Sequence, residues 1–222
     1  MRLIGNIRFT KEQVTMIDEK FNIIKDRMKY WVIKFYGPSD AVFLSGLSSK
    51  MPESFKFDKG ISLINEYPSV EDCKIYYDPQ YPEGIQLYNF LDNINDLLIV
   101  NSEVKEVFED LGVDSIEYLP IWLCDHNHEV SSKDYFICNV LSKIDIFDME
   151  ESEYDMSSLD ESQIADVDNM IVDYDAVPKD AKVFRASKML NQIFINDNVK
   201  QALEKAGFEG FFVKEAEGWN GI

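Results

Sequence analysis

Histidine and cysteine are scarce in this chain of 222 residues, which holds two of the former and three of the latter. The ten glycines are scattered, and none forms a GxxxxGK or GxGxxG phosphate-binding loop. No GxSxG pattern or comparable site for a nucleophilic serine or cysteine is present. An enzyme assignment therefore has no motif to rest on, and we expect a protein that is not an enzyme and has no cofactor.

The cysteines Cys73, Cys124 and Cys138 are odd in number and lie in unrelated surroundings, which argues against a disulfide framework. No apolar run approaches the roughly 18 residues that a membrane span needs. The first residues lack the basic and apolar pattern of a signal peptide. We therefore expect a soluble, cytoplasmic protein, and its 45% of apolar residues can build a substantial core.

Basic residues are also in short supply, because 22 of them stand against 41 acidic residues and leave a formal net charge of −19. Such a field repels the phosphates of nucleic acids and the surfaces of anionic membranes. We expect neither as a partner, and a basic protein is the partner that the charge would attract. The alternative is that the charge serves solubility alone, and composition does not choose between the two.

Two segments, 99–119 and 194–213, follow one pattern of strand, capped helix, glycine and strand. Asn101 or Ser102 can cap the first helix, and Asn196 and Asp197 stand at the corresponding positions, 95 residues later, to cap the second. A glycine follows each apolar helical stripe and ends the helix. The two units predict an α+β fold in which short helices pack on a mixed, mainly antiparallel sheet with internal pseudo-repetition. Neither unit contains a catalytic group.

Other stretches predict further elements. A T-x-x-Q capping box opens an amphipathic helix over 10–28, and 30–37 is a β-rich run. An Asp-Lys-Gly turn between alternating residues predicts a hairpin at 55–63, whereas 85–97 is compatible with either helix or strand. The apolar stripe of the first helix could also mediate self-association in an adaptor module, which leaves a monomer and a homodimer both open.

The acidic segment, residues 145–175, contains twelve acidic residues and no lysine or arginine. Long runs of like charge are commonly solvated faces or loops, so solubility is one interpretation. The other is a docking surface for a cationic partner, with Tyr154 as an aromatic anchor. The residues expected to contact that partner are Asp148, Glu150, Glu151, Glu153, Tyr154, Asp155, Asp160 and Glu161.

The only metal-like cluster is the run CDHNH at 124–128, with Cys124, His126 and His128 as candidate ligands. A structural zinc site normally takes four ligands, often as two separated pairs, and the chain offers no complementary second pair. We therefore expect no metal. The alternative function is a metal-dependent hydrolase that uses these three residues with nearby carboxylates, and metal analysis would distinguish it from a binding protein.

The order of several motifs resembles the polymorphic-toxin immunity proteins of family eleven. The resembling residues are YFICNVLSKIDIFDMEES with Asn139 and the D-x-E-x-S pattern of Asp148, Glu150 and Ser152, then KVFRASKM with Phe184 and Arg185, and finally IFINDNVKQALEKAGFEGFFV. The resemblance covers about residues 97–213. We expect these to form the core of a single α+β domain over 1–222, in which 1–28 is an N-terminal helical extension.

The resemblance implies a small cytoplasmic protein that binds and neutralises a toxin made by the same or a sibling cell. It implies no catalytic residues and does not identify the toxin. Toxins that attack nucleic acids need cationic clefts to hold phosphates. The acidic segment would match such a cleft in charge, so the sequence favours an immunity protein against a basic toxin, such as a nuclease.

Overall fold

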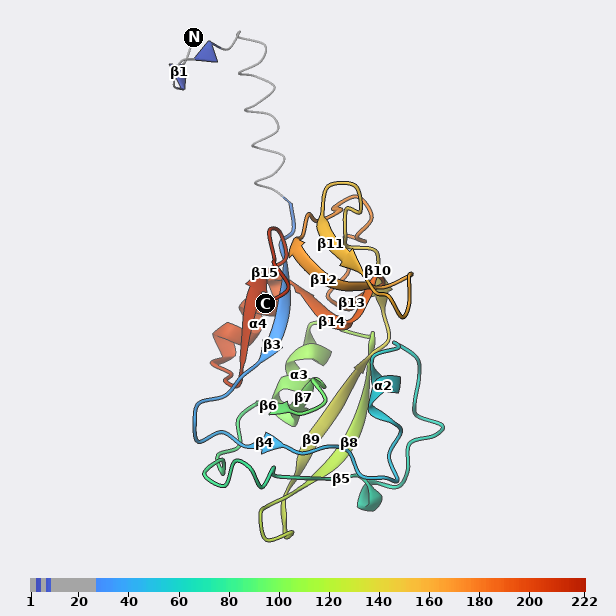
Figure 1. Ribbon diagram of the computed structural model, residues 1–222. Coiled ribbons are helices and arrows are strands. Elements are labelled where there is room, and N and C mark those ends of the chain that lie inside the picture. Colours follow the sequence, from blue (N-terminus) through green and yellow to red (C-terminus); the bar gives the residue numbers. More distant parts are fainter. Residues whose placement is uncertain (1–2, 5–6, 9–26) are drawn as a thin grey trace.

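The computed structural model describes residues 3–4, 7–8 and 27–222, with side chains from Arg27 onward (Figure 1). The helix predicted over 10–28 falls almost wholly outside this part. Strands β1 (Leu3–Ile4) and β2 (Ile7–Arg8) form an antiparallel pair. The remainder is mostly strand with a few short helices, so the predicted α+β class with mixed sheets is confirmed at that level.

The first sheet has six strands, of which the two outermost are parallel to their neighbours and the inner ones antiparallel. In spatial order they are β4 (Phe43–Leu44), β6 (Phe90–Asn93), β7 (Ile99–Asn101), β9 (Val130–Val140), β8 (Ile116–Cys124) and β5 (Lys74–Tyr76). The helical segments α2 (Ser54–Phe57), η1 (Val70–Asp72) and α3 (Ser102–Asp110) lie beside it.

The second sheet has five strands, again with one parallel pair at its edge. In spatial order they are β10 (Lys143–Ile144), β13 (Val183–Ala186), β14 (Met189–Asn196), β3 (Tyr30–Phe35) and β15 (Phe211–Glu215). Helix α4 (Asp197–Ala206) contacts β14 and β3 of this sheet. A separate hairpin of β11 (Glu153–Met156) and β12 (Ile164–Asn169) packs above it in Figure 1.

Both repeated units fold as the sequence predicts. The side chains of Asn101 and Asn196 cap α3 and α4 by accepting the backbone N–H three residues on, at 3.2 and 3.0 Å. Gly112 and Gly207 follow the two helices with φ of +66° and +74°. Glycine adopts this left-handed conformation without the steric cost that other residues meet, which is why it stops a helix there.

The two halves of the chain, residues 27–126 and 127–222, exchange their first strands. In the first sheet β7 and β8 are parallel to each other and β9 runs antiparallel between them. In the second sheet β14 and β15 are related in the same way, with β3 between them. Since β3 begins the first half and β9 begins the second, each half supplies the strand that completes the other half's sheet.

The register of these pairings is the same in both halves. Tyr30 lies opposite the cap Asn196, just as Tyr135 lies opposite the cap Asn101. The outer strands also correspond. Strand β10 pairs in parallel with β13 in the second sheet, and β4 pairs in parallel with β6 in the first. The repetition seen in the sequence therefore extends to five corresponding strands and one helix in each half.

Three clusters of buried residues form the core. One lies around the first sheet and one around the second, and the third is shared by both. The shared cluster contains the inner faces of the two repeated helices, with Val104 and Phe108 from α3 and Val199 and Leu203 from α4. Because each helix needs a sheet to cover its apolar face, this cluster joins the two halves.

The hairpin predicted at 55–63 is wrong. The segment begins within the single helical turn α2, and Gly60 follows with φ +56°, but no strand forms on either side of the turn. Phe57 is fully buried, and its carbonyl accepts a hydrogen bond from the Arg185 guanidinium at 2.8 Å. Long-range packing of this aromatic ring thus overrides the local hairpin signal.

The β-rich run at 30–37 forms strand β3, as predicted, and the ambiguous segment 85–97 contains strand β6. Within the part of the chain that the structure describes, no helix is both long and apolar enough to cross a membrane.

Candidate functional site: an acidic hairpin

Most of the acidic segment is an ordered hairpin rather than a loop, and we call residues 153–169 the acidic hairpin. Tyr154 lies opposite Val167 in the antiparallel pair β11–β12, and Met156 lies opposite Ile164. Ile164 and Val167 are buried in the core of the second sheet, and Tyr154 packs against that core. Two register shifts in this pair allow Ile164 and Val167, three residues apart, both to be buried, and most of the acidic side chains are exposed to solvent.

The tip of the hairpin is held by its own side chains. Ser157 Oγ accepts the backbone N–H groups of Leu159 and Asp160 at 3.2 and 3.3 Å. The Asp160 carboxylate accepts both the hydroxyl and the backbone N–H of Ser162, at 2.6 and 3.0 Å, and these bonds lower the pKa of Asp160. This ordered turn presents Leu159 with 98% of its surface exposed.

The D-x-E-x-S pattern positions the start of the hairpin. The half-buried Asp148 accepts the backbone N–H groups of Glu150 and Glu151 at 3.0 and 3.1 Å, which leaves both glutamate side chains exposed. Ser152 donates its hydroxyl to the Ile171 carbonyl and accepts the Ile171 N–H, at 3.2 and 2.9 Å. The pattern is therefore structural, and it fixes where the exposed acids begin.

Six of the eight predicted contact residues share this exposed surface: Glu150, Glu151, Glu153, Asp155, Asp160 and Glu161. Asp148 is half-buried, as described above. Tyr154 is also half-buried, and its hydroxyl donates to the Met149 carbonyl at 3.2 Å. The prediction missed Leu159 and Met156, two exposed apolar side chains among the acids. A single leucine in a polar run gives little signal, because only the fold shows that it stands at a turn.

No lysine or arginine within residues 27–222 forms an ion pair with the acids of this hairpin. The acidic segment contributes no cation of its own either. None of these acids is ion-paired among the described residues, although Lys59 is near enough to help lower the pKa of Asp160, and the acids surround a small apolar projection. A centre of apolar contact with a charged rim is a common arrangement in protein–protein interfaces.

Arg185, in the KVFRASKM motif, also has a structural role. The buried guanidinium donates to the carbonyls of Val140, Leu190 and Phe57 at 3.1, 2.7 and 2.8 Å. Burial lowers the pKa of Arg185, and Asp58 at 3.8 Å acts against that effect. Its donors tie β13 to the ends of β9 and α2, so Arg185 holds the two halves together.

Asn139 has a similar role. It is fully buried and donates to the Ile61 carbonyl at 2.9 Å and to the Glu117 carboxylate at 3.0 Å. Glu117 also accepts from Ser62 and from the Leu63 N–H. Desolvation raises the pKa of Glu117, but the hydrogen bonds together outweigh it and lower that pKa. This network fastens the loop after α2 onto strand β8.

The cluster at 124–128 forms the turn between β8 and β9 and lines a cavity of about 400 Å³. His126 stands edge-on to Tyr77, its Nε2 3.3 Å from a backbone carbonyl, and His128 stands edge-on to Tyr76. Cys124 is buried, and burial raises the pKa of its thiol. Among the described residues, no three histidine, cysteine or acidic side chains converge on a possible metal position, so the hydrolase alternative gains no support.

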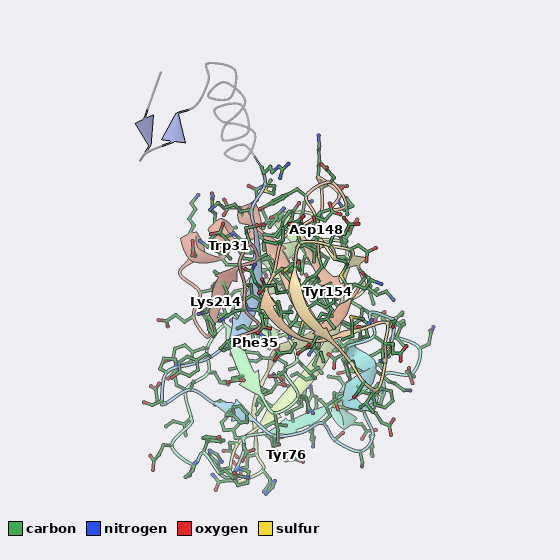
Figure 2. All side chains as sticks on the ribbon, turned by 45° about the horizontal axis from the view of Figure 1, so that its top comes forward. Trp31, Phe35, Tyr76, Asp148, Tyr154 and Lys214 are labelled. Atoms are coloured by element: carbon green, nitrogen blue, oxygen red, sulfur yellow. The ribbon has the colours of Figure 1, made fainter. Side chains whose placement is uncertain are left out.

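The two regions lie at opposite ends of the molecule. Figure 2 shows Asp148 in the upper part of the view, Tyr154 nearer its middle, and Tyr76, from the histidine cavity, at its lower end. Carboxylates of the acidic hairpin are therefore not available to the histidines.

The described residues thus form an α+β fold of two larger sheets that carries an exposed acidic hairpin. In the comparison with known families, the model of the immunity protein family Imm11 matches residues 12–218. The chain belongs to this family, and the match extends well beyond the resemblance predicted over 97–213. Immunity proteins act against a toxin and are generally non-enzymatic inhibitors. No curated protein matches the chain.

Proposed function

We propose that this immunity protein neutralises its cognate toxin by placing the acidic hairpin against a basic surface of the toxin. The observation that supports this proposal is the ordered cluster of exposed carboxylates around Leu159, none of which is in an ion pair within residues 27–222. Opposite charge on the toxin would accelerate the encounter toward 10⁸–10⁹ M⁻¹s⁻¹ at low salt. Fast capture is what a cell needs when the toxin acts on its own components.

A nuclease is the kind of toxin that fits best, since it holds phosphates in a cationic cleft. Carboxylates on a projecting hairpin can occupy the positions of those phosphates and block the cleft. Leu159 supplies apolar contact, which slows dissociation once the charges have guided the approach. In this proposal the protein acts in the cytoplasm, by occlusion and without chemistry.

The test uses two variants that each remove four negative charges. The hairpin variant carries Glu153→Gln and Asp155→Asn in the acidic hairpin and Glu150→Gln and Glu151→Gln just before it. The control carries Glu71→Gln, Glu83→Gln, Glu106→Gln and Asp110→Asn at other exposed positions. Association with the product of the neighbouring gene is followed by stopped-flow at several salt concentrations. The hairpin variant should associate about tenfold more slowly at low salt, with a flatter salt dependence.

The control variant should stay close to the unmodified protein, because its charges lie away from the contact. Both variants have the same net charge, so their difference reports position rather than total charge. Equal association rates for the two variants would assign the acidic hairpin to solubility.

A further inference from the structure

Among the residues that the structure describes, strand β15 has an open edge. It pairs with β3 on one side, and it is the last strand of the second sheet. Tyr36 N–H donates to the Gly210 carbonyl at 3.1 Å, and Ala216 N–H donates to the Tyr30 carbonyl at 2.9 Å. The backbone N–H and C=O groups of successive residues in an antiparallel strand point to alternate sides. Since Gly210 and Ala216 bond to β3 and the residue that follows it, the backbone groups of residues 212 and 214 also point toward β3.

The backbone N–H and C=O groups of Phe211, Val213 and Glu215 then point away from β3. Within residues 27–222, no hydrogen bond to these groups is formed. A row of unpaired backbone groups on an edge strand is a template for another strand. Beside this row, the side chain of Phe212 is 41% exposed.

The corresponding edge in the first half lies beside another segment of the chain. Glu117 of β8 corresponds to Phe212, and its side-chain carboxylate accepts the Leu63 N–H at 2.8 Å. Pro120 corresponds to Glu215, and its carbonyl accepts the Tyr67 hydroxyl at 3.1 Å. Farther along, β8 pairs with the additional strand β5, which has no counterpart in the second sheet.

The difference arises from how each half uses one insertion. Residues 45–89, between β4 and β6, form the loop and strand that cover β8. Residues 145–182, at the same position between β10 and β13, form the acidic hairpin instead. The same position in the chain therefore holds the acidic hairpin in the second half, and in the first half it holds the segment that lies beside the edge of β8.

We propose that an extended segment of the basic toxin adds to β15 as a further strand, with Phe212 as an apolar contact. This inference rests on the proposed function and names a second part of the same interface. A second copy of this chain is a poorer occupant, because it would bring one net charge of −19 against another.

One partner can reach both surfaces. The residues that follow β15 bond to the chain just after β12, where Trp219 and Gly218 exchange backbone hydrogen bonds with Met170 at 2.8 and 2.7 Å. This C-terminal tail bridges the open edge and the acidic hairpin. Figure 2 shows Lys214, on β15, and Tyr154 at about the same height, near the middle of the view.

Amide hydrogen exchange, measured by NMR with and without the product of the neighbouring gene, tests the inference. In the free protein the amides of 212 and 214 should be protected by β3, and those of 211, 213 and 215 should exchange freely. In the complex these three should slow by at least tenfold, while 212 and 214 serve as the internal control. Unchanged exchange at 211, 213 and 215 in the complex, or protection already present in the free protein, overturns the inference.

A variant separates this inference from the proposed function. Val213→Pro removes one outward N–H without touching the bonds to β3, and Val213→Ala keeps that N–H as the matched control. Val213→Pro should weaken binding about tenfold more than Val213→Ala and leave the salt dependence intact, unlike the charge-neutralised hairpin. Equal affinities for the two variants contradict strand addition while leaving the acidic contact standing, and a complete absence of binding overturns both.

Discussion

Trp31 and Phe136 occupy the same position in the two halves of the molecule. Trp31 pairs with Glu215, and the centre of its ring lies 4.7 Å from Lys200 Nζ. Phe136 pairs with Pro120, and its ring centre lies 5.0 Å from Lys105 Nζ. Each aromatic residue sits on a strand that belongs to one half and completes the sheet of the other. The fold is thus a repeated unit whose first strands have been exchanged.

This exchange predicts that neither half folds alone. If the chain is divided between His126 and Asn127, in the turn that joins β8 to β9, each fragment lacks the central strand of its own sheet. The separate fragments should show no cooperative thermal unfolding by circular dichroism, and an equimolar mixture should recover it. A cooperative transition in either fragment by itself would show that the exchanged strand is dispensable.

Leu159 should matter for binding and not for stability. Because 98% of its surface is exposed, Leu159→Ser should change the free energy of unfolding by less than about 0.5 kcal/mol. The same change should weaken toxin binding by about 1–2 kcal/mol, mainly through faster dissociation. Ile85→Ser, at a residue 69% exposed in the other half, is the control and should leave dissociation unchanged. Identical dissociation rates for both variants would remove Leu159 from the interface.

The two helix caps should differ in strength. Asn101→Ala removes one capping bond and should cost about 1 kcal/mol. Asn196→Ala should cost about 2 kcal/mol or more, because Asn196 is buried and also donates to the Ala181 carbonyl at 2.9 Å. Urea denaturation of both variants measures the two costs. A larger loss for Asn101→Ala would contradict this ranking.

Asp92 provides a pH-dependent test. Desolvation raises the pKa of Asp92, and the nearby negative charge of Asp96 raises it further. The hydrogen bond from the Asn93 N–H lowers this pKa but does not cancel the rise. A carboxylate with a raised pKa in the folded state lowers stability once the pH rises above the ordinary aspartate range, near 3.9, where the unfolded chain ionises. Asp92→Asn should therefore raise the urea midpoint at pH 7. The benefit should vanish below about pH 3, where Asp92 is protonated in both states, and a benefit that persists there would rule out this cause.

Local patterns predicted the repeated helices well, because a cap such as Asn196 and a stop such as Gly207 act within one turn of chain. The exchange of β3 and β9 was beyond such patterns. Pairing between strands a hundred residues apart depends on burial and register, and the same β-rich run at 30–37 would serve in either sheet. The hairpin expected at 55–63 failed for a related reason, since Phe57 packs against distant residues.

The sequence predicted the composition of the acidic segment but not its three-dimensional structure. Its charge predicted a surface, whereas the order of that surface comes from bonds such as those of Ser152 to Ile171 and from the burial of Val167. The open edge of β15 could not be predicted at all. It becomes apparent only when the two sheets are compared strand by strand.

The most direct measurement is calorimetric titration of this protein with the product of the neighbouring gene at two salt concentrations. The account predicts a tight one-to-one complex whose affinity falls as salt rises, because charges on the acidic hairpin guide and hold a basic toxin. Tight binding that is indifferent to salt would contradict the role of the acidic hairpin. No binding at either concentration would contradict neutralisation of that toxin altogether.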